Sequence, residues 1–442
     1  MKLTSCRIAM TVVVPLIVAG AAAMQTAPLA AQQHTRESAR PIAAMHDSAQ
    51  SDAHQEKPSA LDGAFGAHVV PMVTHVSPIL AGAAKTEGYL TQPTLFATAT
   101  ALDGALAVSA AVSLEAVTLD RGELGAGSYG EGYVDRRHPH TYLHELMVSA
   151  RHVAGPLTAS LAAGRGFAPF GTDDPMMRPF VKFPVNHHLG QVLERLVLIG
   201  AVTARGVHLE AGAFNGNEPL DAADLGSLER FGDSWAGRVT IAPVRGIELQ
   251  ASRAWIVSPE FPLGGGWDQR KWSASARYER THPFGTIYAL AEWNRTTQVD
   301  RGTDVFSFGS VLAEAAVDIS GWRPAIRFER AERPEEERMA DPFRTPWPHG
   351  GGHVLGITRW TNTAARLERT ISAGRFGVAP FVEGSMAHVV ETADGLFDPR
   401  EFYGSRTIWA ISIGARLRAG WHPPRMGRYG AAATAAGSTH EH

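Results

Sequence analysis

The feature that most constrains this chain is a strand-like alternation of apolar and polar residues, which recurs over stretches of about ten to fourteen residues. Successive side chains of a strand point to opposite faces, so each stretch predicts a strand with one apolar and one polar face. The pattern is clear at 106–115, 271–279, 322–329 and 406–421. Two stretches, 192–204 and 376–389, instead carry apolar residues on both faces.

These stretches are about twice as long as the five or six residues of an average soluble strand. They match the nine to eleven tilted residues that cross a bilayer as a strand. The polar faces carry both charge signs, as Arg238 and Glu210 illustrate. We therefore expect an all-β fold, a transmembrane antiparallel up-and-down β-barrel with a wet interior and an apolar exterior.

The connections alternate between short and long. Tight turns with Gly or Pro are expected at 103–104, 155–156, 205–206, 245–246, 283–285, 320–321 and 374–375. Longer polar connections lie at 119–140, 167–191, 216–232, 258–269, 298–304, 334–352 and 390–405. Short turns at one end and long loops at the other are typical of bacterial outer-membrane barrels.

Seven tight turns pair about fourteen strands, and 406–421 adds one more. Such barrels have an even strand number, so one strand is missing. Ala67–Val76 is the candidate, although Pro71 cannot donate to a ladder. We expect about sixteen strands, with fourteen as the alternative, and both termini of the chain on the periplasmic side.

The first residues have the pattern of a secretory signal. Lys2 and Arg7 precede an apolar run from Ile8 to Ala23, and small residues follow to Ala31. We expect residues 1–31 to be a cleaved signal peptide, the alternative being an uncleaved anchor. Cys6, the only cysteine, falls within it. The predicted mature chain then has a disordered periplasmic leader (32–66), the barrel (67–421) and a flexible C-terminal tail (422–442).

Trp409 and Trp421 fall on one face of the last strand, and we expect them to mark the two membrane interfaces, roughly 30 Å apart. The alternating run that ends at Trp421 resembles the closing strand of Gram-negative outer-membrane β-barrels of the porin kind. It departs from that pattern because the chain continues beyond the aromatic residue. The resemblance implies a location in the cell outer membrane, with membrane lipid and the barrel-assembly machinery as partners and a homotrimer as the assembly.

Two long loops are rich in histidine and carboxylate. His138, His140, His144, His187 and His188 could approach one another, because the loops follow each other on the same rim. Imidazole and carboxylate suit Zn, Cu or Ni, so a metal site is one hypothesis. The alternative is that these side chains tie the loops together.

The loop 167–191 could instead fold into the lumen and narrow it. Its candidate constriction charges are Asp173, Asp174, Arg178 and Lys182. The wall charges expected to line the pore are Arg277, Glu279, Arg323, Arg327, Glu329, Arg366, Glu368 and Arg416.

Three functions are compatible with this barrel. The first is a passive pore for small hydrophilic solutes or ions, which needs no cofactor. The second is a metal-handling barrel, and the third is a barrel enzyme or a plugged structural barrel. The net charge of −3 argues against a nucleic-acid partner. No G-x-S-x-G or H-E-x-x-H motif is present, so we expect no enzyme.

Overall fold

The computed structural model describes residues 61–433, apart from 80–81, 120–123, 125–140, 186, 193, 220–221, 262, 337–353 and 393–397. In this part of the chain the strands are β1 (Leu61–Ser77), β2 (Lys85–Ala101), β3 (Leu106–Ser113), β4 (Leu143–Ala154), β5 (Leu157–Gly166), β6 (Arg195–Ala204), β7 (Val207–Phe214), β8 (Ser234–Val244), β9 (Ile247–Ile256), β10 (Asp268–His282), β11 (Gly285–Asp300), β12 (Thr303–Asp318), β13 (Trp322–Glu336), β14 (Val354–Arg369), β15 (Ile371–Ala373), β16 (Phe376–Glu391) and β17 (Thr407–Gly420). The short helices are α2 (Glu115–Thr118), η1 (Pro175–Met177), α3 (His187–Gly190) and α4 (Pro399–Tyr403). None of the described helices is long and apolar enough to cross a membrane.

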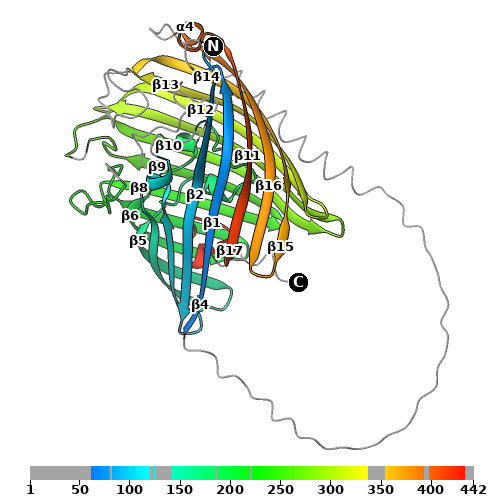
Figure 1. Cartoon of the computed structure of the whole chain (residues 1–442). Helices are drawn as coiled ribbons and strands as arrows, with labels where there is room; N and C mark the ends of the chain where they lie inside the picture. The colour runs from blue at the N-terminus through cyan, green and yellow to red at the C-terminus, as the bar shows by residue number, and fades with distance from the viewer. Residues whose placement is uncertain are drawn as a thin grey trace, which may run out of the picture. The chain divides into compact units, whose positions relative to one another are not determined.

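The strands close into one antiparallel barrel in which each strand pairs with its neighbours along the chain (Figure 1). The first and last strands complete the ring, with Gly66 opposite Gly420 and Ser77 opposite Trp409. Because β14 and β15 both pair with β16, they form one wall strand, and the described residues make a sixteen-strand barrel. The expected up-and-down barrel of sixteen strands is confirmed, and the alternative of fourteen is set aside.

The missing strand is β1, which runs through Pro71 beside a bulge on β2. It begins at Leu61, earlier than the expected start at Ala67. All seven expected tight turns are present. The long connection expected at 298–304 is wrong: β11 and β12 are joined by Arg301 and Gly302 alone. Both residues have positive φ (46° and 84°), the backbone of a tight two-residue hairpin that matches strand twist.

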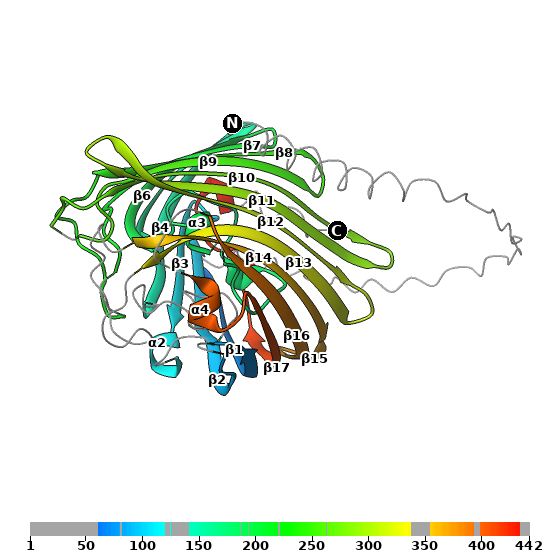
Figure 2. The ribbon, with the colours of Figure 1, turned by 90° about the horizontal axis from the view of Figure 1, so that it is seen from above.

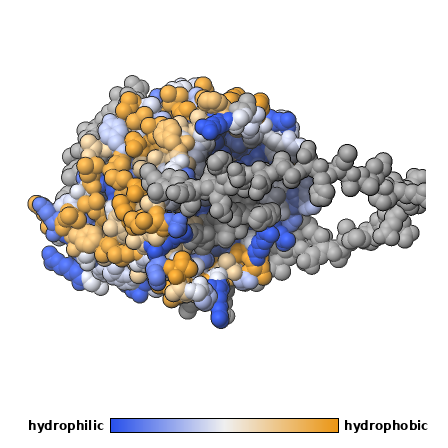
Figure 3. All heavy atoms as spheres, turned by 90° about the horizontal axis from the view of Figure 1, so that it is seen from below, coloured by the Kyte–Doolittle hydropathy of each residue, from blue (hydrophilic) through white to orange (hydrophobic). Residues whose placement is uncertain are grey.

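The outer wall is a belt of exposed apolar side chains. Ile326 is 58% exposed and Ile413 64%, and many Leu, Val and Trp side chains of the other strands are exposed in the same way. In Figure 3 hydrophobic residues cover much of the visible outer wall. Such an area is unfavourable in water, so this surface is suited to lipid.

Trp421 does not belong to that belt, which corrects the expected pair of interface tryptophans. Trp409 is exposed on the outer wall, but Trp421 packs against the buried Phe96 and Met426. The reason is Gly420, which ends β17 with a φ of +71° and turns the chain away from the wall.

The inside of the barrel is largely filled by the connection between β5 and β6 and by the chain beyond β17. Figure 2 shows α3 and the red C-terminal segment within the ring of strands. The expected flexible tail 422–442 is therefore wrong for residues 422–433, where Met426, Tyr429 and Ala432 are buried. Residues 434–442 and the leader up to residue 60 lie outside the described residues.

This filling explains why two strands are apolar on both faces. Val197 and Ile199 of β6 pack inward against Phe170 and Tyr429. The inner face of β16 packs likewise, with Val389 beside Tyr403 of α4. Elsewhere the inner face meets the inserted segments through polar side chains, which build the site described next.

Candidate lumen site

The loop between β5 and β6 crosses the inside of the barrel, held by arginines of the far wall. Arg366 of β14 and Arg416 of β17 donate to the Pro179 carbonyl at 2.8 Å and 2.9 Å. Arg327 of β13 donates to the Lys182 carbonyl at 2.8 Å. These donors satisfy carbonyls that would otherwise be buried without a partner.

Wall carboxylates hold the same loop through its backbone amides. Val181 N donates to Glu383 at 3.1 Å, and Val185 N donates to Glu329 at 2.9 Å. Glu292 of β11 accepts from Arg178 at 3.0 Å and from the Thr172 hydroxyl at 2.7 Å. The loop is thus fixed to the inner wall by charge-assisted hydrogen bonds, which are stronger than neutral ones.

The structure places the predicted constriction charges inside the barrel, but each is committed to a contact. Asp174 caps η1 by accepting from Met176 N at 2.7 Å, and its burial raises its pKa. Arg178 is buried against Glu292. Lys182 donates to the Tyr89 hydroxyl and lies over its ring. Their role in selectivity stays a prediction.

The predicted wall charges all face the lumen, and they fall into two groups. One group is buried on the part of the wall that holds the inserted loop: Arg327, Glu329, Arg366, Glu368 and Arg416. The other is partly exposed near the short turns: Arg277, Glu279 and Arg323. Arg323 lies 3.6 Å from Asp318, with side chains 23% and 41% exposed. Sequence reasoning found the face of each residue but could not tell the two groups apart.

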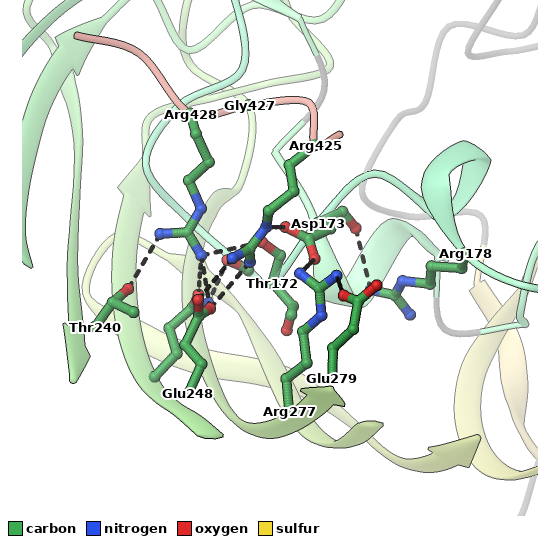
Figure 4. Close-up of polar contacts among 12 residues, drawn as sticks. Thr172, Asp173, Arg178, Thr240, Glu248, Arg277, Glu279, Arg425, Gly427 and Arg428 are labelled. Carbon is green, nitrogen blue, oxygen red and sulfur yellow. Dashed lines mark hydrogen bonds and ion pairs between the residues drawn. The ribbon is translucent and has the colours of Figure 1, made fainter. Parts of the chain in front are cut away.

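The C-terminal segment, defined here as residues 422–433, meets the loop through Arg425 (Figure 4). Arg425 Nε donates to Asp173 Oδ1 at 2.6 Å. Its two terminal nitrogens donate to both oxygens of Glu248, on β9, at 2.6 Å and 2.9 Å. The other Asp173 oxygen accepts from Arg277 of β10 at 3.0 Å, and Arg277 also contacts Glu279.

A second arginine of the segment, Arg428, contacts side chains of β7, β8 and β9. It donates to Glu210 at 3.2 Å, to the Thr240 hydroxyl at 3.1 Å and to Gln250. Arg238 forms a bidentate pair with Glu210, both distances being 2.6 Å, and also donates to the Gly427 carbonyl. Paired charges of this network thus connect the segment to the wall.

Beyond Arg428 the segment is anchored by Tyr429. Its hydroxyl donates to Glu145 of β4 at 3.0 Å and accepts from Phe167 N at 3.0 Å. Ala431 N then donates to the Ser160 hydroxyl at 2.8 Å, and the Ala431 carbonyl accepts from Thr203. Burial raises the pKa of the Tyr429 hydroxyl, which therefore stays a proton donor.

The charge of Asp173 is set by its neighbours. Burial alone would raise its pKa, but Arg425 and Arg277 outweigh burial and hold the pKa below its ordinary value. Arg425 is held in its charged form in the same way: burial would lower its pKa, and Asp173 and Glu248 raise it. The charged neighbours of Asp173 and Arg425 thus favour the ionised form of both side chains, although both are buried.

Sequence reasoning missed the C-terminal part of this site because it assigned 422–442 to a tail. A signal was present. His422–Tyr429 contains two prolines, two arginines, a methionine and a tyrosine, which is not the composition of a flexible tail.

The metal-site hypothesis falls mostly on residues that the structure does not describe, and it stays a prediction. His138 and His140 lie outside the described residues, as does the side chain of His188. His144 Nδ1 lies 2.7 Å from Glu194, and the His187 ring packs on Phe183. Among the described residues, no group of three or more His, Cys, Asp or Glu side chains could hold a metal ion.

The chain is similar to known proteins in architecture only. No family model matches the chain, and no curated protein matches it. Among solved structures it is similar to an anion-selective porin from Comamonas acidovorans, with 11% identity and a TM-score of 0.49 over 82% of this chain and 100% of that one. It is similar to Pseudomonas putida OprB, with 11% identity and a TM-score of 0.48 over 82% and 94% of the chains. The trimer form of OmpT, an outer membrane protein of Vibrio cholerae, has 10% identity and a TM-score of 0.46 over 82% and 100%.

Proposed function

We propose that the protein is a porin-like channel of the Gram-negative outer membrane, which lets small hydrophilic solutes or ions diffuse passively. The closed antiparallel barrel supports this, because it leaves no unpaired sheet edge in lipid. The exposed apolar belt supports it further, since that surface is compatible with hydrocarbon. An N-terminal signal peptide over residues 1–31 is part of the proposal.

The observation that carries the proposal is a set of charges that remain partly exposed on the inner wall. The side chains of Arg323 and Asp318 are 23% and 41% exposed, and that of Glu279 is 30% exposed. Charged groups stay exposed only where water reaches them, because desolvating an unpaired charge is costly. Exposed charges near the short turns support a water-filled passage of the kind that polar solutes require.

The inserted loop supplies the narrow part of this path. It crosses from β5 to the walls made by β13, β14, β16 and β17, and wall hydrogen bonds hold it there. A narrowing fixed by charge-assisted bonds excludes large solutes. Small size is therefore the first criterion that we expect for a permeating solute.

Conductance of the refolded full chain in a planar bilayer tests the proposal. We expect steady single-channel steps that grow with salt concentration. A correctly folded barrel that never conducts, with or without residues 422–442, would refute it. We also propose that the protein is a homotrimer. Measuring the mass of the protein in detergent solution tests this directly.

A further inference from the structure

The inner wall beside the C-terminal segment carries an excess of carboxylates. We call Glu210, Glu248 and Glu279 of the wall and Asp173 of the loop the carboxylate site; Arg238 and Arg277 of the wall are the cations paired with it. Without the segment these six side chains have a net charge of −2. Arg425 and Arg428 of the segment bring two positive charges and balance it.

The contacts have the geometry of guanidinium recognition. Glu248 accepts two parallel N–H bonds from Arg425, at 2.6 Å and 2.9 Å, while Asp173 accepts the third from Nε. This fork matches a planar guanidinium group and cannot be reproduced by the point charge of an ammonium group. Three donors of one guanidinium thus have fitted acceptors from two distant parts of the chain.

The segment that fills this site is not part of the wall. β17 ends at Gly420, and no residue of 422–433 joins the strand pairing. The segment enters after the φ of +71° at Gly420 and is held inside by side-chain contacts and the packing of Tyr429. It can therefore leave the lumen without breaking any backbone hydrogen bond between the strands of the barrel.

We propose that residues 422–433 are a tethered occupant of a cation site, and that the carboxylate site binds guanidinium-bearing cations from solution when the segment withdraws. The inference rests on the proposed channel function and adds to it a solute class and a device that narrows the path. A solute with a guanidinium group competes with Arg425 for Glu248 and Asp173, so solute and segment exclude each other.

The double variant Arg425→Gln/Arg428→Gln tests this in the full chain. It leaves the carboxylates uncompensated, so the segment should leave and the pore should become more cation-selective by reversal potential. L-argininamide added on the short-turn side should then block the current. L-lysinamide, which has the same charge without the fork, should need about tenfold higher concentration for the same block. The control is Arg406→Gln, which removes an exposed ion pair with Glu391. Arg406 lies just before β17, whereas the segment begins after the other end of that strand, so this variant should behave like wild type.

Equal block by the two amides, or an unchanged reversal potential, would overturn the inference while leaving the channel function intact. Absence of conductance from wild type and every folded variant would instead refute the channel function. The two failures are therefore distinguishable in one set of recordings.

A cysteine at position 432 provides a measurement that does not depend on the double variant folding. Ala432 is buried inside the barrel, and Cys6→Ser removes the only native thiol. If argininamide displaces the segment, it should raise the rate at which a polar maleimide modifies Ala432→Cys, by about tenfold more than lysinamide does. A rate that neither amide changes would overturn the inference.

Discussion

Arg425 and Asp173 are 252 residues apart in the chain, yet their side chains meet inside the barrel with Nε 2.6 Å from Oδ1. Each also has a partner on the wall: Glu248 for Arg425, and Arg277 for Asp173. The contact therefore joins three independent parts of the fold, namely the inserted loop, the C-terminal segment and the strands β9 and β10.

Asp173→Asn should release the segment. The change leaves the buried Arg425 and the partly exposed Arg277 with one carboxylate fewer, and breaking a buried ion pair costs about 3–5 kcal/mol. We expect a lower free energy of unfolding in urea titrations and faster proteolysis at Arg425. Asp304→Asn is the matched control, because its pair with Arg270 is exposed and is worth about 0–1 kcal/mol. Equal effects of the two changes would mean that the Asp173 contact does not hold the segment.

Acidification should open the same contact. The pKa of Asp173 is lower in the folded protein than its ordinary value of 3.8. Its stabilising effect is thus fully present above that value and is lost as pH falls through the lower, folded pKa. Conductance should be steady between neutral pH and about pH 5, and should change below about pH 3.8. Asp173→Asn should abolish that acid response, and a response that persists in the variant would assign it to another group.

The faces of the strands could be predicted from sequence because the strand period is two and membrane and lumen demand opposite polarity. The exposed Trp272 next to the buried Lys271 is an example. The tight turns could be predicted because Gly and Pro mark them, as at Arg205–Gly206.

The site could not be predicted in the same way, because its partners come from distant segments. Glu210 was recognisable as a lumen residue, but nothing local indicates that Arg428 lies 3.2 Å from it. Arg178 and Lys182 could be predicted as lumen charges, whereas the pairing of Arg178 with Glu292 and the contact of Lys182 with Tyr89 depend on how the whole loop crosses the barrel. The face of a strand residue and the position of a turn depend on nearby residues, whereas the packing of the lumen depends on contacts between distant segments.

Arg416→Met should loosen the inserted loop. Arg416 donates to the carbonyls of Arg178 and Pro179 inside the lumen, and each lost hydrogen bond from a charged donor costs about 1.5–3 kcal/mol. Trypsin should then cut the loop at Arg178 or Lys182 faster than in wild type. Arg418→Met is the matched control: it lies two residues along the same strand, with an exposed side chain. Equal cutting of both variants would contradict the role assigned to Arg416.

The last prediction concerns the outer wall, where depth in the membrane should decide the effect of a charge. Ile326 lies between Trp322 and Phe328 on the outer face of β13, and Phe376 is the first residue of β16, beside a tight turn. Both are exposed, so water-exposed surfaces would tolerate arginine equally at the two positions. In lipid, Ile326→Arg should cost about 2–4 kcal/mol of folding free energy and Phe376→Arg about 0–1 kcal/mol, since the penalty peaks at the bilayer midplane. Urea titration in lipid vesicles measures both values. Equal costs would mean that the apolar belt does not face hydrocarbon, which would contradict the proposed membrane location.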